Sequence, residues 1–141
     1  MQTVIGSQFP EAVIPLIKDS KNSINIIVYD WRFYPQDPAA IAQQFNQAIV
    51  EAVRRGVKVK AILNNKQPIN YLNQQGIEAR QLNTARIVHC KLMIIDDKII
   101  ILGSHNYTQH AFTLNYELSI ILKQETEQTD FLTFFNNLWP K

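Results

Sequence analysis

Residues 88–108, VHCKLMIIDDKIIILGSHNYT, combine two apolar runs with a polar turn, and they decide the predicted fold. The runs of Val, Ile, Leu and Met on either side of Asp96, Asp97 and Lys98 are typical of a hairpin of buried strands. Desolvating a His, a Lys or an Asp inside a sheet costs free energy, yet this stretch contains all three. These polar groups therefore need an explanation beyond the fold.

Strand and helix patterns alternate on both sides of this hairpin. The predicted strands are 23–29, 57–63, 87–95, 99–103 and 116–122, and the predicted helices are 11–18, 38–55, 68–75 and 125–139. Asp37 and Pro38 resemble the N-cap and first residue of the longest internal helix, which Gly56 would end. The order predicts one α/β domain over residues 1–141, with a mixed β-sheet sandwiched between helices.

Length and composition agree with one folded domain. The chain has 141 residues, of which 46% are hydrophobic, enough for a single buried core. Its N-terminus lacks a signal-peptide pattern, and no apolar run reaches the roughly 18 residues of a membrane span. The lone Cys90 excludes an intramolecular disulfide and fits a reducing compartment. We expect a cytoplasmic protein without membrane insertion, although a processed secreted form stays open.

Positive charge is concentrated in the middle of the chain, although the net charge is only +2. Between residues 54 and 91 the sole acidic residue is Glu78, and the basic residues are Arg54, Arg55, Lys58, Lys60, Lys66, Arg80, Arg86 and Lys91. Such a segment suits a polyanion such as nucleic acid or an anionic lipid surface. Solvated helix and strand ends explain it equally well, because neighbours in sequence need not form one patch.

Polar residues recur where the predicted strands begin and end. On a strand, His89 and Lys91 share one face about 7 Å apart, so both can address one phosphate. Lys91 would supply charge, and His89 a nucleophilic or proton-transferring nitrogen. Ser104 and Asn106 add uncharged hydrogen-bonding groups after the next strand. Glu117 precedes another strand and could hold an imidazole in one tautomer.

These residues match a known pattern. His89, Lys91 and Asp96 fit His-x-Lys-x4-Asp, and residues 103–106 fit Gly-Ser-x-Asn, the two parts of the phospholipase D superfamily motif. The sequences NYE at 115–117 and VEAVRRGVKVKAIL at 50–63 extend the likeness over nearly the whole chain. The chain resembles above all the small single-motif bacterial endonucleases of that superfamily. The resemblance implies a phospholipase D-like fold and a phosphodiesterase that needs neither metal ion nor cofactor.

The resemblance also implies a role for each residue of the motif. His89 is the expected nucleophile, forming a phosphohistidine, while Lys91 and Asn106 bind the nonbridging phosphate oxygens. Ser104 supports the phosphate or His89, and Glu117 orients His89. Asp96 is counted among the catalytic residues as part of the motif, with the role of a structural partner of the site rather than of a phosphate ligand.

The single motif implies a homodimer. Family members with two motifs bring them together within one chain, and single-motif relatives resemble them by pairing identical subunits. We expect nucleic acid as the substrate, hydrolysed in a site shared across the two-fold axis. The alternatives are a phospholipase D or phosphatidyl transferase acting on phospholipids, and a noncatalytic nucleic-acid-binding module with the same fold.

Two other groups of residues have competing interpretations. His105 and His110 could hold a metal ion with His89 or act as an in-chain acid, but histidines on the surface or in turns are the expected interpretation. The aromatic residues Trp31, Phe33 and Tyr34 follow a predicted strand and could stack on bases. Packing in the core or a loop explains these aromatic residues at least as well.

Overall fold

The fold is a single seven-stranded mixed sheet with helices on both faces. A computed structural model describes residues 1–141. Its elements are β1 (Gln2–Ile5), α1 (Gln8–Lys18), β2 (Ser23–Val28), α2 (Ile41–Arg54), β3 (Lys58–Leu63), α3 (Ile69–Gln74), β4 (Glu78–Gln81), β5 (Leu92–Ile95), β6 (Ile99–Gly103), α4 (Gln109–Thr113), β7 (Leu118–Lys123) and α5 (Thr129–Leu138). The expected α/β class with a mixed sheet is confirmed.

The strand order β1-β7-β6-β5-β2-β3-β4 joins a parallel half to an antiparallel half. Strands β2, β3 and β4 run parallel, whereas β5 pairs antiparallel with both β2 and β6. Strands β1, β2, β3, β4 and β6 therefore end at one end of the sheet, where β5 and β7 begin. We call this the site end, and the opposite end the far end.

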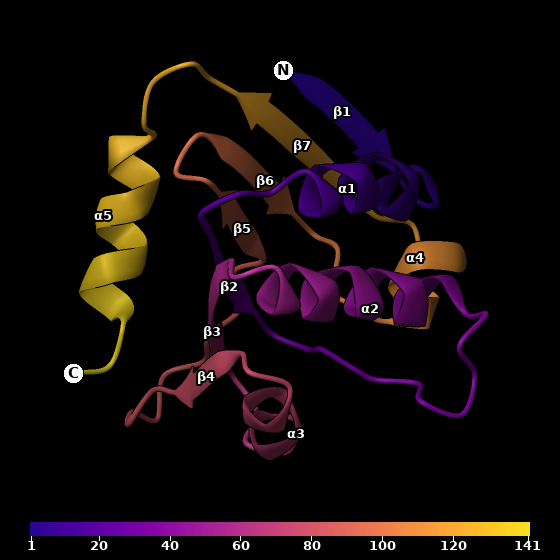
Figure 1. The fold of residues 1–141 in the computed structure, drawn as a ribbon, viewed down its shortest axis with the longest axis horizontal. Helices are drawn as coiled ribbons and strands as arrows, with labels where there is room; N and C mark the ends of the chain where they lie inside the picture. Colours follow the sequence, from indigo (N-terminus) through magenta and orange to yellow (C-terminus); the bar gives the residue numbers. More distant parts are fainter.

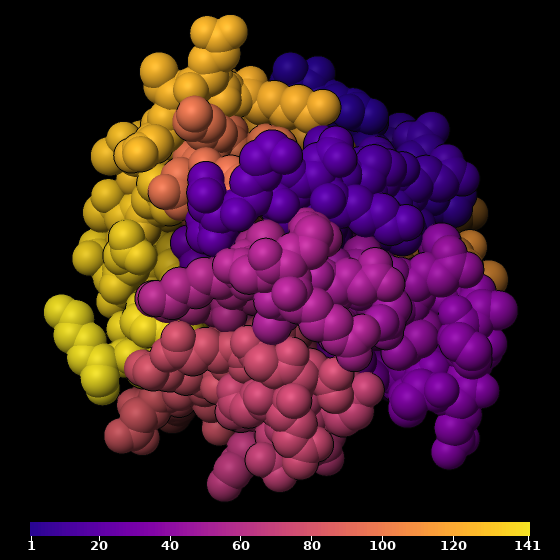
Figure 2. All heavy atoms as spheres, viewed as in Figure 1, coloured from indigo at the N-terminus to yellow at the C-terminus, as the bar shows by residue number.

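Two apolar cores lie on opposite faces of the sheet. Helices α1, α2, α3 and α4 contribute to a cluster of 27 buried residues on one face. Helix α5 covers the other face with a smaller cluster around Phe135. Figure 1 shows α5 apart from α1 and α2, with the strands between them. Figure 2 shows the outer side of the first face, where α1, α2 and α3 lie next to one another. None of the helices is long and apolar enough to cross a bilayer.

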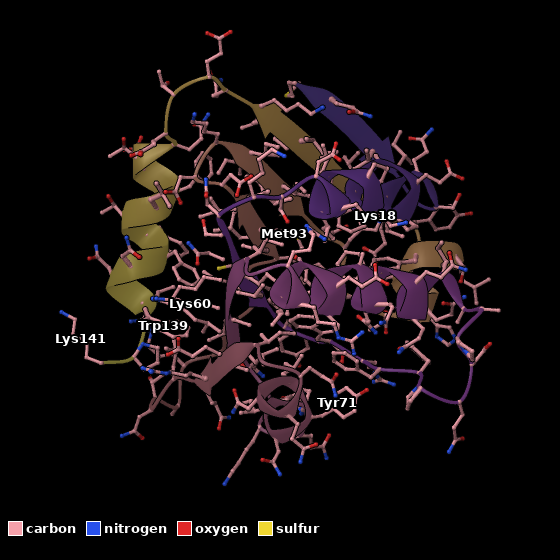
Figure 3. All side chains as sticks on the ribbon, viewed as in Figure 1. Lys18, Lys60, Tyr71, Met93, Trp139 and Lys141 are labelled. Atoms are coloured by element: carbon pink, nitrogen blue, oxygen red, sulfur yellow. The ribbon has the colours of Figure 1, made fainter.

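Helix α5 docks through the apolar side that its sequence predicts. Phe135 is buried, and Phe131, Leu138 and Trp139 pack against the same cluster. The Lys60 ammonium lies 5.0 Å and the Arg80 guanidinium carbon 4.7 Å from the Trp139 ring centroid, so cations of β3 and β4 hold the end of the helix. Figure 3 shows Lys60 beside Trp139.

Several predicted boundaries are wrong. Strand β5 begins at Leu92 rather than at residue 87, and α2 begins at Ile41 with Ala40 as its N-cap, so Asp37 and Pro38 do not start the helix. Residues 36–40 form turns instead, and the side chain of Gln109 accepts the Ala42 N–H at the start of α2. The short elements β1, β4 and α4 were not expected, because each has four or five residues and one or two buried side chains.

Candidate active site

His89 and Lys91 lie together at the site end, just before β5. The Lys91 Nζ is 3.3 Å from both ring nitrogens of His89, which confirms that the two side chains share one side of the chain. They do so in a segment that precedes β5 rather than within a strand. Lysine can only donate, so a hydrogen bond to His89 requires an unprotonated ring nitrogen, the form that a nucleophile needs.

Tyr29 supports this pair and was not identified from the sequence. Its ring centroid is 5.1 Å from that of His89, and the Lys91 Nζ lies 5.7 Å from it. Tyr29 directly follows β2, the strand that pairs with β5, and this neighbour relation brings the three side chains together. Tyr29 could have been identified only by knowing that β2 pairs with β5, because a single tyrosine after a strand does not by itself indicate a site.

Lys91 is partly desolvated at this position. Burial lowers the pKa of the Lys91 ammonium, while the charge of the Glu117 carboxylate acts in the opposite direction. A carboxylate from the start of β7 therefore acts electrostatically on a cation from the start of β5. The site has both signs of charge before any substrate binds.

Gly103 allows β6 and β7 to approach closely where the site forms. A Cβ atom at this position would overlap the Ser119 side-chain oxygen, the Leu118 carbonyl oxygen and the Ser119 Cα. Two of these three atoms are backbone, so they cannot rotate away. Ser104 follows directly, and its Oγ donates to Glu117 Oε1 at 2.6 Å and accepts the Leu118 N–H at 3.0 Å. The Gly-Ser pair thus joins the end of β6 to the start of β7.

Glu117 does not make the contact expected from the resemblance. Its two carboxylate oxygens accept hydrogen bonds from Ser104 and from the Asn115 amide, the latter at 3.1 Å. No hydrogen bond joins Glu117 to His89. The structure places this carboxylate at the site end, but fixes it to Ser104.

The Asn106 side chain is oriented by backbone. Its Oδ1 accepts the Asp30 N–H at 3.1 Å, which leaves the Nδ2 group to donate elsewhere. Residues 30–32 run beside residues 106–107, held by the Tyr107 N–H on the Asp30 carbonyl and the Arg32 N–H on the Tyr107 carbonyl. Asn106 therefore presents an amide donor at the same end of the sheet as His89 and Lys91.

Asp96 lies away from these groups, at the far end of β5. Its carboxylate accepts the backbone N–H groups of Lys21, Asn22 and Ser23 at 2.7 to 3.2 Å, at the start of β2. The four residues of β5 lie between Lys91 and Asp96, which are therefore about 16 Å apart along the strand. The inclusion of Asp96 in the catalytic set is wrong, because it secures the far end of the sheet; its expected structural role agrees with these contacts.

The other histidines do not join His89. His105 follows β6 in a segment outside the helices and strands, but it is only 1% exposed, so its assignment to the surface is wrong. Its Nε2 donates to the Gly6 carbonyl, its Nδ1 accepts from Ser119 Oγ, and its ring stacks on Phe9 at 4.4 Å. Burial lowers the pKa of His105. His110 is exposed. No group of three or more His, Cys, Asp or Glu residues is arranged to hold a metal ion.

The basic residues at 54–60 lie mostly away from the site. Arg54 and Arg55 end α2, and Lys58 begins β3 at the far end, with its N–H on the Asn22 carbonyl. Arg55 donates to carbonyl groups of Ile17 and Ser20. The six residues of β3 place about 20 Å between this group and the site end. The solvated-surface interpretation therefore describes these residues better than substrate binding.

Comparison with known proteins agrees with this geometry. The family model described as cardiolipin synthase, PLD-like domain, matches residues 13–139. A mitochondrial cardiolipin hydrolase from Chlamydomonas reinhardtii is 33% identical over 100 residues, 67% of this chain and 45% of the relative. The chain thus spans less than half the length of that curated relative.

Two solved structures share the fold over nearly their whole lengths. NucT from Helicobacter pylori superposes with a TM-score of 0.75 at 25% identity, covering 97% of this chain and 93% of NucT. Nuc from Salmonella typhimurium, described as a phospholipase D family member, has a TM-score of 0.79 at 24% identity, with 98% and 93% covered. With the family match over residues 13–139, these results show that the chain belongs to the phospholipase D superfamily.

Proposed function

We propose that this protein hydrolyses phosphodiester bonds of nucleic acids through a phosphohistidine on His89. The observation that carries the proposal is the meeting of His89, Lys91 and the free Nδ2 of Asn106 at one end of the sheet. An unprotonated imidazole provides the nucleophile, and an ammonium and an amide provide the donors that a phosphoryl transition state requires. A binding module without activity has no need for all three.

The reaction then proceeds in two steps. A His89 nitrogen attacks phosphorus, the bond to the leaving oxygen breaks, and a general acid gives that oxygen its proton. Lys91 and Asn106 donate to the nonbridging oxygens as their charge grows. Water next attacks the phosphohistidine, losing its proton to the same acid-base group, and His89 is released. Neither step draws on a metal ion or a cofactor.

One chain offers a nucleophile, but neither of its other two histidines contacts His89. His105 has both ring nitrogens engaged in the core. A homodimer with the site on its two-fold axis supplies the acid as His89 of the second copy. Exposed apolar side chains surround Glu117 and support such a contact: Ile5, Leu114, Tyr116 and Leu118. Ile5 and Leu118 are direct partners across β1 and β7, so they form part of one surface.

A phospholipid substrate is the second candidate, and one feature favours it. An apolar groove of about 420 Å³ lies between α5 and the ends of β5 and β6, lined mainly by Leu92, Leu102, Phe131 and Phe134, with Lys91 at its edge. Such a groove could take an acyl chain of a lipid whose phosphate lies at Lys91. The resemblance to the small single-motif bacterial endonucleases and the likeness of NucT over nearly its whole length lead us to favour nucleic acid.

The test compares substrates under chelation. Purified protein is incubated with labelled single- and double-stranded DNA, RNA and phospholipid vesicles after exhaustive EDTA treatment, with His89→Ala as the inactive control. We expect nucleic-acid cleavage by the wild type alone. Cleavage of lipid without nucleic acid would overturn the substrate, and complete loss in EDTA that a divalent ion restores would overturn the metal-free mechanism.

A further inference from the structure

A polar hollow of about 490 Å³ lies at the site end, next to the residues that hold Asn106. It is bounded by the segment after β2 and by the segment that joins β3 to α3. The lining residues that matter for its chemistry are Asp30, Arg32, Phe33, Asn65, Gln67 and Tyr71. None of their side chains has a role in the reaction proposed above.

The hollow adjoins the phosphate-binding groups. Asp30 lines it, and the N–H of the same residue holds the Asn106 amide. Tyr29, the preceding residue, contacts His89. A substrate whose phosphate lies between His89 and Asn106 therefore has its next chemical group within reach of this hollow.

One wall of the hollow is aromatic. Phe33 and Tyr71 are half-buried, with ring centroids 4.6 Å apart. Tyr71 extends from α3 toward the segment after β2 in Figure 3. The earlier suggestion that Trp31 could stack on bases is wrong, because Trp31 is 3% exposed and its Nε1 donates to Asn46. Phe33 and Tyr71 are the aromatic rings that remain accessible here.

The charges of the hollow cancel. Arg32 Nε lies 3.2 Å from both oxygens of the Asp30 carboxylate, and no other charged residue lines the hollow. The Arg32 side chain is 66% exposed, and its two terminal nitrogens have no protein partner. A neutral group with hydrogen-bonding edges fits this balance better than a second phosphate does.

Side-chain amides complete the lining. Asn65 and Gln67 are exposed, and the Gln67 amide forms no hydrogen bond within the protein. An amide donates and accepts at once, so it can form hydrogen bonds with the edge of any base. An acyl chain in this hollow would leave the two terminal nitrogens of Arg32 and the Gln67 amide without partners, which is costly once water is displaced.

We propose that this hollow binds the nucleobase next to the scissile phosphate, with the base against Tyr71 and its edge facing Gln67 and Arg32. The inference rests on the proposed nuclease activity and extends it by assigning a base subsite. Planar stacking accepts any base, so we expect preference for the presence of a base rather than for its identity.

The test measures kcat/KM for a dinucleotide and for its two counterparts that lack one base or the other. Stacking on an aromatic side chain contributes about 5- to 150-fold per base. Wild type should lose activity in this range when one particular base is removed. Tyr71→Leu should lose a similar factor on the intact dinucleotide and little further on the abasic one, so the two losses are not additive.

Two variants at exposed positions separate loss of base binding from loss of folding. Gln67→Ala changes an exposed side chain and should give a smaller loss of the same kind, whereas Gln74→Ala, exposed on the same helix as Tyr71 and outside the hollow, should match wild type. Equal rates on intact and abasic substrates, or equal losses on both in Tyr71→Leu, would overturn the base subsite alone. Failure of the wild type to cleave any dinucleotide while it cleaves lipid would overturn the proposed nuclease function and the subsite together.

Discussion

Replacing Gly103 by Ala should damage both the stability and the activity of this protein. The added Cβ meets the Leu118 carbonyl oxygen and Ser119 Cα, which belong to the backbone of β7. Relief therefore requires the two strands to separate where they are paired. Ser104 then moves away from Glu117 and from the Leu118 N–H, the two partners that hold it at the site end.

The size of the effect follows from this clash. Overpacking by one methyl group in a closely packed place costs about 1–3 kcal/mol of unfolding free energy. For a chain of this length we expect the Tm to fall by about 3–10 °C. If Ser104 and Glu117 help to position the charges around Lys91, then kcat should also fall, and the loss should persist at temperatures where the variant is fully folded.

Thermal unfolding followed by circular dichroism and initial rates of oligonucleotide cleavage at 20 °C measure the two effects. Gly56→Ala is the matched control, because Gly56 has a φ of +99° and open space around its Cβ position. In this control, backbone strain should lower the unfolding free energy by about 1–2 kcal/mol, and with it the Tm, but leave the cleavage rate unchanged. A Gly103→Ala variant with the Tm and rate of wild type would refute the close approach of the two strands.

Four further predictions test other parts of the structure. Lys91→Ala and Asn106→Ala should each lower kcat about 10²- to 10³-fold with a native circular dichroism spectrum, and wild-type rates in both would remove them from the site. Excess His89→Ala, mixed with wild type under subunit exchange, should lower activity beyond dilution; undiminished activity in demonstrated heterodimers contradicts a shared site. Burial lowers the folded-state pKa of His105, so its contribution to the unfolding free energy should be complete above about pH 6.5 and be lost as pH falls below that value. Unfolding free energies measured from pH 8 to pH 5 should show this loss in wild type and less of it in His105→Phe, and parallel curves would exclude His105 as its source. The double variant Arg54→Glu and Lys58→Glu should retain affinity and salt dependence for oligonucleotides, since both residues lie at the far end, and a marked drop in affinity would place substrate there.

The sequence predicts the central hairpin and the phosphate-binding groups well, because both depend on local pattern. Two apolar runs around Asp96 and Asp97 define β5 and β6, and both turn residues adopt positive φ angles. The spacing of His89 and Lys91 predicts that they lie together, and they do so although they precede the strand β5. Neither inference needs any knowledge of which segments pair across the sheet.

Features that arise from pairing between distant segments were not predictable. Tyr29 reaches His89 because β2 lies beside β5, and His105 is buried against Gly6, Phe9 and Ser119, which come from distant parts of the chain. The short strands β1 and β4 lie at the two edges of the sheet, where few side chains are buried and the apolar signal is weak. Asp96 was counted with the catalytic residues because it stands close to them in the motif, although β5 separates it from them in space.

The position of Asp96 also gives a meaning to the spacing of the motif. The four residues between Lys91 and Asp96 are the whole of β5, so the spacing of the motif equals the length of this strand. Lys91, at one end of β5, belongs to the candidate active site. Asp96, at the other end, accepts hydrogen bonds from the backbone at the start of β2. Substitutions among apolar residues at 92–95 should therefore be tolerated more readily than any change of length, because an insertion cannot satisfy both ends at once.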